Sequence, residues 1–126
     1  MFIYHNPNPK RRSVGDCVIR AISTVTEQNW DDVFLDIVEI AFHEKDMPSS
    51  NSIYGKYLNE LGFRRFLISD QCPDCYTVRD FCRDYPFGRY ILSLDSHVVA
   101  VINGDYYDTW DSGSEVPLFY WKEMRL

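Results

Sequence analysis

Three residues that lie far apart in the sequence, Cys17, His97 and Asp108, have the side chains that nucleophilic acyl transfer needs. A thiolate attacks a carbonyl carbon, an imidazole removes and returns the proton, and a carboxylate fixes the tautomer of the imidazole. The three residues serve this chemistry only if the fold brings them together. The elements that contain them therefore have to be predicted first.

The segment around Cys17 predicts a helix that begins at the cysteine. Asp16 is a residue type that caps helices, because its carboxylate can accept bonds from the free N–H groups of the first turn. Apolar residues with the spacing of a buried helix face follow at Val18, Ile19 and Ile22. Cys17 would then lie where the helix dipole favours a thiolate. The alternative interpretation is a small buried hydrophobic residue, since free cysteine is often buried.

A hairpin is predicted near the C-terminal end of the chain. Asn103-Gly104 is a strong signal for a two-residue turn, here between strands at 97–102 and 106–110. His97 begins the first of these strands. Among the three histidines of the chain, it is the one placed at the end of a buried strand, where a general base is expected.

The register of this hairpin selects a partner for His97. With Asn103-Gly104 as the turn, Val99 lies opposite Asp108, so His97 and Asp108 project from the same face one step apart. Asp111 falls on the other face and is expected to be solvated. A bulge in either strand would reverse this assignment.

The arrangement resembles the papain-like cysteine peptidase superfamily, in which the nucleophile opens the first helix and the base lies on the later sheet. Residues 15–21 (GDCVIRA) also look like the nucleophile segment of ovarian-tumour-type deubiquitinases, and Asp16-Cys17 is similar to the start of bacteriocin-leader peptidases. The resemblance implies a cysteine peptidase or related thiol acyl-transfer enzyme that acts on a peptide, isopeptide or amide bond of a protein or peptide substrate. It implies a catalytic triad of Cys17, His97 and Asp108, and no cofactor or metal.

The resemblance also points to residues that would assist the triad. Papain-like enzymes carry a glutamine about six residues before the cysteine to complete the oxyanion hole, and Arg11 stands there in this chain. Asn6 and Asn8 are candidates for the missing amide donor. Independently of the resemblance, the basic run 10–12 makes Arg11 a candidate for binding an acidic substrate, and the hairpin register predicts that Trp110 packs near His97.

Composition limits the classes of protein that the chain can belong to. Its 126 residues, 45% of them hydrophobic, suit a single domain over residues 1–126. A net charge of −6 disfavours nonspecific nucleic-acid binding, which depends on phosphate neutralisation. The sequence has no apolar run as long as a membrane span and does not begin like a signal peptide. We therefore expect a cytoplasmic protein with reduced cysteines and no membrane partner.

The remaining elements complete an α+β domain with a papain-like arrangement, in which N-terminal helices pack on a C-terminal antiparallel sheet of at least four strands. The Asn-Pro repeat in residues 1–13 favours an extended or turning arm. Helices are expected at 17–25, 30–44, 52–61 and 78–85, and strands at 63–68, 89–94, 97–102, 106–110 and 118–121.

Three other cysteines allow competing interpretations. Cys72-x-x-Cys75 with Cys82 lacks a fourth ligand for structural zinc. A redox dithiol is also disfavoured, because Cys75 precedes the expected helix cap Thr77 instead of lying in the first helical turn. We interpret the three as incidental thiols.

A noncatalytic protein-binding module or inhibitor on the same scaffold is the alternative function. Aromatic residues are enriched at interface hot spots, and the C-terminal part of the chain is rich in them. The candidate anchors are Tyr106, Tyr107, Trp110, Tyr120 and Trp121. The competing interpretation is that most of these side chains fill the core.

Overall fold

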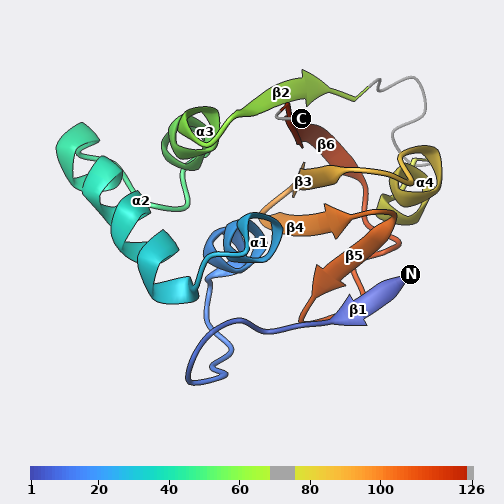
Figure 1. Cartoon of the computed structure of the whole chain (residues 1–126), viewed down its shortest axis with the longest axis horizontal. Helices are drawn as coiled ribbons and strands as arrows, with labels where there is room; N and C mark the ends of the chain where they lie inside the picture. Colours follow the sequence, from blue (N-terminus) through green and yellow to red (C-terminus); the bar gives the residue numbers. More distant parts are fainter. Residues whose placement is uncertain (69–75, 125–126) are drawn as a thin grey trace.

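A computed structural model describes residues 1–68 and 76–124 of the chain. Within these ranges the protein has four helices and one six-stranded sheet (Figure 1), which agrees with the expected α+β class. In chain order, the elements are β1 (Phe2–Tyr4), α1 (Cys17–Thr26), α2 (Trp30–Glu44), α3 (Asn51–Glu60), β2 (Phe63–Leu67), α4 (Val78–Asp84), β3 (Arg89–Leu94), β4 (His97–Ile102), β5 (Asp105–Asp108) and β6 (Pro117–Glu123).

The sheet differs from the expected C-terminal antiparallel sheet. Its strand order is β1-β5-β4-β3-β6-β2, so one edge is formed by the N-terminal arm and the other by a strand that precedes α4. β1 pairs with β5 in parallel, and the other pairs are antiparallel. The arm was expected to be extended, but a three-residue strand that pairs with a segment 104 residues later (Phe2 with Tyr106) leaves no local pattern in the sequence.

Helices cover both faces of the sheet. On one face, α1, α2 and α3 share a core with Ile91, Val98 and Trp121 of the strands. On the other face, α4 packs against Leu92, Val99 and neighbouring strand residues. Consecutive residues of β3 and β4 thus belong to different cores, as the alternation of a strand requires. The two cores hold β4 and β5 in fixed positions beside α1.

The predicted hairpin is present with the predicted register. Asn103 and Gly104 have φ angles of 49° and 80°, the left-handed values that a type I′ turn needs at both central positions. Ile102 pairs with Asp105, and the ladder continues to Ala100 with Tyr107. β5 ends at Asp108, two residues earlier than expected.

The helix bounds lie within one residue of the predicted ones, and α2 and α4 begin at side-chain caps. Asn29 caps α2 by accepting a bond from the Asp32 N–H at 2.8 Å. Thr77 and Asp80 form the expected capping box of α4. Among the described residues, no helix is long and apolar enough to cross a membrane.

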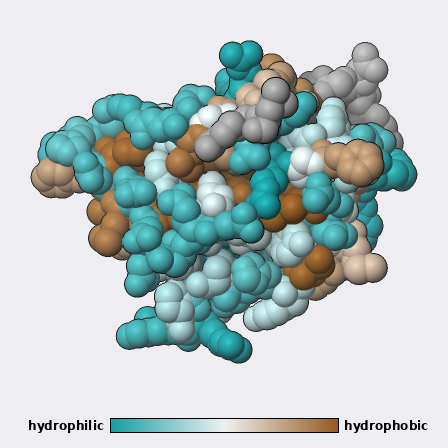
Figure 2. Space-filling view, viewed as in Figure 1, coloured by the Kyte–Doolittle hydropathy of each residue, from teal (hydrophilic) through white to brown (hydrophobic). Residues whose placement is uncertain are grey.

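Hydrophobic residues also reach the surface, and on the face seen in Figure 2 they gather over α2. Leu35 and Phe42 of this helix are more than 60% exposed.

Candidate active site

Cys17 is the first residue of α1 and is partly buried. α1 packs against β4, and Cys17 lies beside His97, the first residue of β4. The thiol interacts with the His97 ring and with the backbone N–H of Val98. The fold thus brings the cysteine to a histidine eighty residues later.

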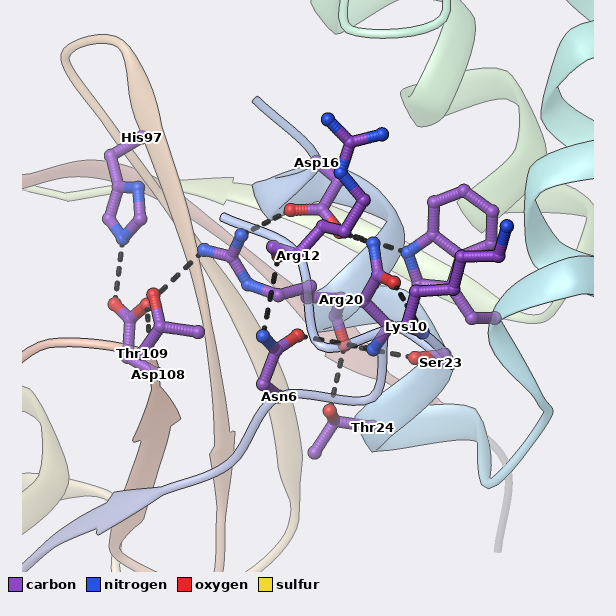
Figure 3. A network of polar contacts seen from close by, with 12 residues as sticks. Asn6, Lys10, Arg12, Asp16, Arg20, Ser23, Thr24, His97, Asp108 and Thr109 are labelled. Atoms are coloured by element: carbon purple, nitrogen blue, oxygen red, sulfur yellow. Dashed lines mark hydrogen bonds and ion pairs between the residues drawn. The ribbon is translucent and has the colours of Figure 1, made fainter. Parts of the chain in front are cut away.

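His97 and Asp108 form a direct pair at this end of the sheet (Figure 3). The His97 Nε2 lies 2.7 Å from Asp108 Oδ2, and the side chains are 14% and 2% exposed. Because Nε2 faces the carboxylate, Nδ1 is the ring nitrogen left for the Cys17 thiol. The ring of Trp110 lies 4.9 Å from that of His97 and partly covers it, as expected.

Asp108 is held in place by more than the histidine. The Ser112 hydroxyl donates to Asp108 Oδ2 at 2.7 Å, and the Thr109 N–H donates to Oδ1 at 2.8 Å. Arg20 Nη2 lies 3.5 Å from Oδ1. These contacts fix both oxygens of the carboxylate, and the sequence predicts neither Ser112 nor Arg20 as a partner of Asp108.

Asp16 does not cap α1 as the sequence predicted. Its side chain makes no cap bond and instead forms a buried ion pair with Arg20, one helical turn later. The Trp30 indole N–H donates to Asp16 Oδ2 at 3.0 Å, and the Asn8 amide donates to the same oxygen at 3.3 Å. The i,i+4 spacing of Asp16 and Arg20 was the signal in the sequence that could have revealed this pair.

A chain of buried polar contacts thus connects the N-terminal arm with the candidate triad (Figure 3). It runs from Asn8 through Asp16 and Arg20 to Asp108 and His97. Arg20 stands between two buried carboxylates, which is the pairing that buried charges require. The network ties the orientation of His97 to the position of α1.

The electrostatics of the site favour a charged cysteine–histidine pair. Burial disfavours the imidazolium, but the hydrogen bonds and charges of Asp108 and Cys17 outweigh it and raise the pKa of His97 to about 9. Burial likewise raises the pKa of the Cys17 thiol, but the hydrogen bond and charge of His97, with smaller effects from Val98 and Arg20, leave it below the ordinary value. A thiolate beside an imidazolium is the reactive form for nucleophilic attack.

The other candidate residues of the arm lie in different surroundings. Asn8 is buried and its amide donates to Asp16, so it joins the arm to the residue that precedes α1. Asn6 donates to the Arg12 carbonyl at 3.4 Å and accepts from the Asn8 N–H. Arg11 is exposed with a φ angle of 53°.

Asp111 bonds to partners other than His97, but strand register does not explain this, because β5 ends at Asp108 and Asp111 bonds to Tyr106, which packs in the core beside α4. Its side chain is 46% exposed and pairs with Arg79 of α4 at 3.2 Å. It also accepts a hydrogen bond from the Tyr106 hydroxyl. Asp108 and Asp111 therefore have different partners.

The aromatic anchors of the alternative function are mostly covered. Tyr106 and Trp121 are buried, Tyr107 and Tyr120 are intermediate, and Trp110 is 45% exposed.

Cys82 is buried, and burial raises its pKa to about 11. Cys72 and Cys75 lie outside the described residues.

Comparison of the chain with protein-family models, with curated proteins and with solved structures gives no match in any of the three.

Proposed function

We propose that the protein is a thiol-dependent acyl-transfer enzyme with a papain-like arrangement, which cleaves a peptide, isopeptide or amide bond of a protein or peptide substrate. The observation that carries the proposal is the cluster of Cys17, His97 and Asp108. The cysteine opens a helix, and the histidine is held at 2.7 Å by a buried carboxylate. In space, the histidine lies between the nucleophile and the orienting carboxylate, as this chemistry needs.

The proposed reaction proceeds through a thioester. The Cys17 thiolate attacks the carbonyl carbon, and the tetrahedral intermediate collapses as the imidazolium of His97 gives its proton to the leaving amine. His97 then removes a proton from water, which attacks the thioester and releases the acid and the thiol. Asp108 stabilises the imidazolium in both steps.

The start of α1 supports stabilisation of the oxyanion. No side chain caps this helix, since the Asp16 carboxylate is bonded to other groups. N–H groups of the first turn are thus left for an anion, and the helix dipole favours negative charge there. In this proposal the backbone replaces the amide donor expected from Asn6 or Asn8.

The proposal includes a reducing, cytoplasmic setting. The chemistry requires Cys17 as a free thiol, and the structure places no disulfide on Cys17 or Cys82. Cytosolic conditions keep thiols in this state.

Hydrolysis of a fluorogenic peptide library tests the proposal. We expect native protein to release the fluorophore from a subset of peptides, and expect Cys17→Ala to lose this activity while retaining its melting temperature. Mass spectrometry of acid-quenched reactions should show an acyl group on Cys17. Turnover that persists in Cys17→Ala, or an acyl group on another residue, would contradict the proposal.

A further inference from the structure

A pocket of about 580 Å³ lies between α3 and the two strands β2 and β6. Residues of α3 line one side, and Arg65, Phe119 and Trp121 of the strands line the other (Figure 1). The volume is within the range of about 300–1,000 Å³ that is typical of small-molecule sites. No residue of the candidate triad lines this pocket, so it is a separate site.

The strand register places the three strand residues of the pocket on one face of the sheet. Arg65 pairs with Trp121 in the β2–β6 ladder, and directly paired residues project from the same face. Phe119 precedes Trp121 by two residues in β6 and therefore shares this face. Trp121 belongs to the core formed with α1, α2 and α3, so the guanidinium of Arg65 and the two aromatic rings lie on the side of the sheet that these helices cover.

The two charged residues that line the pocket are both cations, although the chain has a net charge of −6. Lys56 has a carboxylate partner, because its Nζ lies 3.1 Å from Glu44. Arg65 pairs with no carboxylate within residues 1–68 and 76–124. Its guanidinium carbon lies 5.2 Å from the centre of the Phe119 ring, within the range of a cation–π interaction. The pocket thus contains one cation that is held beside a ring and is not neutralised by an ion pair.

Uncharged hydrogen-bond donors lie in the same pocket. The Trp121 residue is 5% exposed, and its indole N–H has no hydrogen-bond partner in the part of the chain that the structure describes. A buried donor without an acceptor is costly and rare in folded proteins. The side-chain amides of Asn51 and Asn59 also line the pocket, and neither is bonded to another described residue. A ligand with acceptor oxygens supplies what these donors lack.

We propose that this pocket binds a small organic carboxylate with a planar apolar body. The carboxylate pairs with Arg65, whose planar fork of N–H donors matches two carboxylate oxygens, and the apolar body packs on the Phe119 and Trp121 rings. A carboxylate fits better than a phosphate ester, because one unpaired cation balances a single negative charge, whereas a phosphate ester carries nearly two. This site goes beyond the proposed function and does not depend on it.

Titration of the native protein with 2-naphthoate, followed by the NMR signal of the Trp121 indole N–H, provides the test. We expect a saturable shift with a Kd of about 1 mM or below. 2-Naphthamide keeps the rings but loses the charge, so it should bind at least about tenfold more weakly. Acetate keeps the charge but loses the rings, so it should not saturate the signal in the same concentration range. Absence of saturation by 2-naphthoate, or equal affinities for the acid and the amide, would overturn the inference.

A matched pair of variants assigns the binding to this pocket. Arg64 and Arg65 are neighbours in β2 and are both exposed, but Arg64 pairs with Lys122 in the ladder and does not line the pocket. Arg65→Gln should weaken binding of 2-naphthoate at least about tenfold, and Arg64→Gln, with the same change of net charge, should keep the affinity within about twofold. Thermal melts show that both variants are folded. Equal losses in the two variants would show that net charge, and not the pocket, attracts the anion.

Two further measurements define the ligand class and the separation from the triad. 2-Naphthyl phosphate should bind more weakly than 2-naphthoate, because Lys56 keeps Glu44 as its partner. Tighter binding of the phosphate would make this a phosphate site and contradict the inference. Cys17→Ala should bind 2-naphthoate with the native affinity within about twofold, since distant sites act independently. A larger change would contradict a separate site.

Discussion

Asp108 is the side chain that orients His97 in the proposed triad, and its replacement tests this role. Replacing Asp108 with alanine removes the partner of His97 Nε2, so the imidazolium and the Cys17 thiolate both lose support. We expect the rate of Cys17 alkylation at neutral pH to fall about tenfold, which corresponds to about one pKa unit. Asparagine keeps the shape and an acceptor oxygen, so its loss should be smaller.

Asp111→Ala is the control for this prediction, because Asp111 contacts Arg79 and Tyr106 and does not contact the histidine. It should leave the alkylation rate unchanged, and thermal melts should show that each variant is folded. If Asp111→Ala lowers the rate of Cys17 alkylation and Asp108→Ala leaves it unchanged, the assignment of Asp108 as the orienting carboxylate is wrong.

Arg20 supplies a second prediction at the residue scale, because removing it leaves two buried carboxylates without their cation. We expect Arg20→Gln to lower the free energy of unfolding by about 3–5 kcal/mol, the usual result of breaking a buried ion pair from one side. Urea unfolding measures this change. The Arg20 side chain is 10% exposed, whereas Arg79, which pairs with Asp111, is 56% exposed.

Arg79→Gln is therefore the matched control and should change the urea midpoint little. If Arg20→Gln and Arg79→Gln lower the free energy of unfolding by similar amounts, burial of the Asp16–Arg20–Asp108 network does not increase its contribution to stability.

At the scale of the elements, α3 packs so closely on the sheet that glycine is needed at one contact. A Cβ atom at Gly55 would lie 2.9 Å from the Trp121 ring, and this ring is buried. Gly55→Ala gains helix propensity of up to about 1 kcal/mol, but overpacking costs about 1–3 kcal/mol. We expect a net loss of about 1 kcal/mol, measured as a lower melting temperature. Gly15→Ala, with no atom within 4 Å of the added Cβ, should melt like the native protein.

The elements that could be predicted are those with a local signal. α2, β3 and β4 have the expected bounds because each combines a regular apolar pattern with clear start or stop residues. The turn chemistry of Asn103-Gly104 also set the register that predicted Asp108 as the partner of His97. β1 could not be predicted, because its three residues become a strand only through pairing with β5.

The site could be predicted only in part for the same reason. Cys17 and His97 stand out by residue type and by their place at the start of an element. The bond from Trp30 to Asp16 and the bond from Ser112 to Asp108 depend on tertiary packing. Asp16 is a residue type that can cap a helix, but its carboxylate pairs with the buried Arg20 guanidinium instead, because a buried cation requires a partner.

At the scale of the whole molecule, the charged pair predicts how stability depends on pH. The pKa of His97 is raised from 6.5 to about 9, so the folded protein binds more protons at this group than the unfolded chain, and stability falls as pH rises through this window. The lowered pKa of Cys17 has the opposite effect, because the folded protein has lost a proton that the unfolded chain keeps. The two effects partly cancel in the native protein.

Cys17→Ser removes the compensating effect and leaves Asp108 to hold the imidazolium. We therefore expect the melting temperature of Cys17→Ser to fall more steeply than that of the native protein above about pH 6.5, over a window that ends below pH 9 because the contributions of Cys17 to the raised pKa of His97 are lost. A Cys17→Ser, His97→Gln double variant should lose this additional slope. Parallel melting curves for native protein and Cys17→Ser would mean that the two groups do not share a proton.

The pH dependence of Cys17 alkylation by iodoacetamide, with the labelled residue identified by mass spectrometry, reports the thiolate–imidazolium pair itself. We expect Cys17 to be the fastest of the four thiols at neutral pH, and its labelling to persist well below the ordinary thiol pKa of 9.0 because His97 stabilises the thiolate. We also expect His97→Gln to move this profile to higher pH. Identical profiles in the two proteins, or faster labelling of Cys72, Cys75 or Cys82, would contradict the thiolate–imidazolium pair.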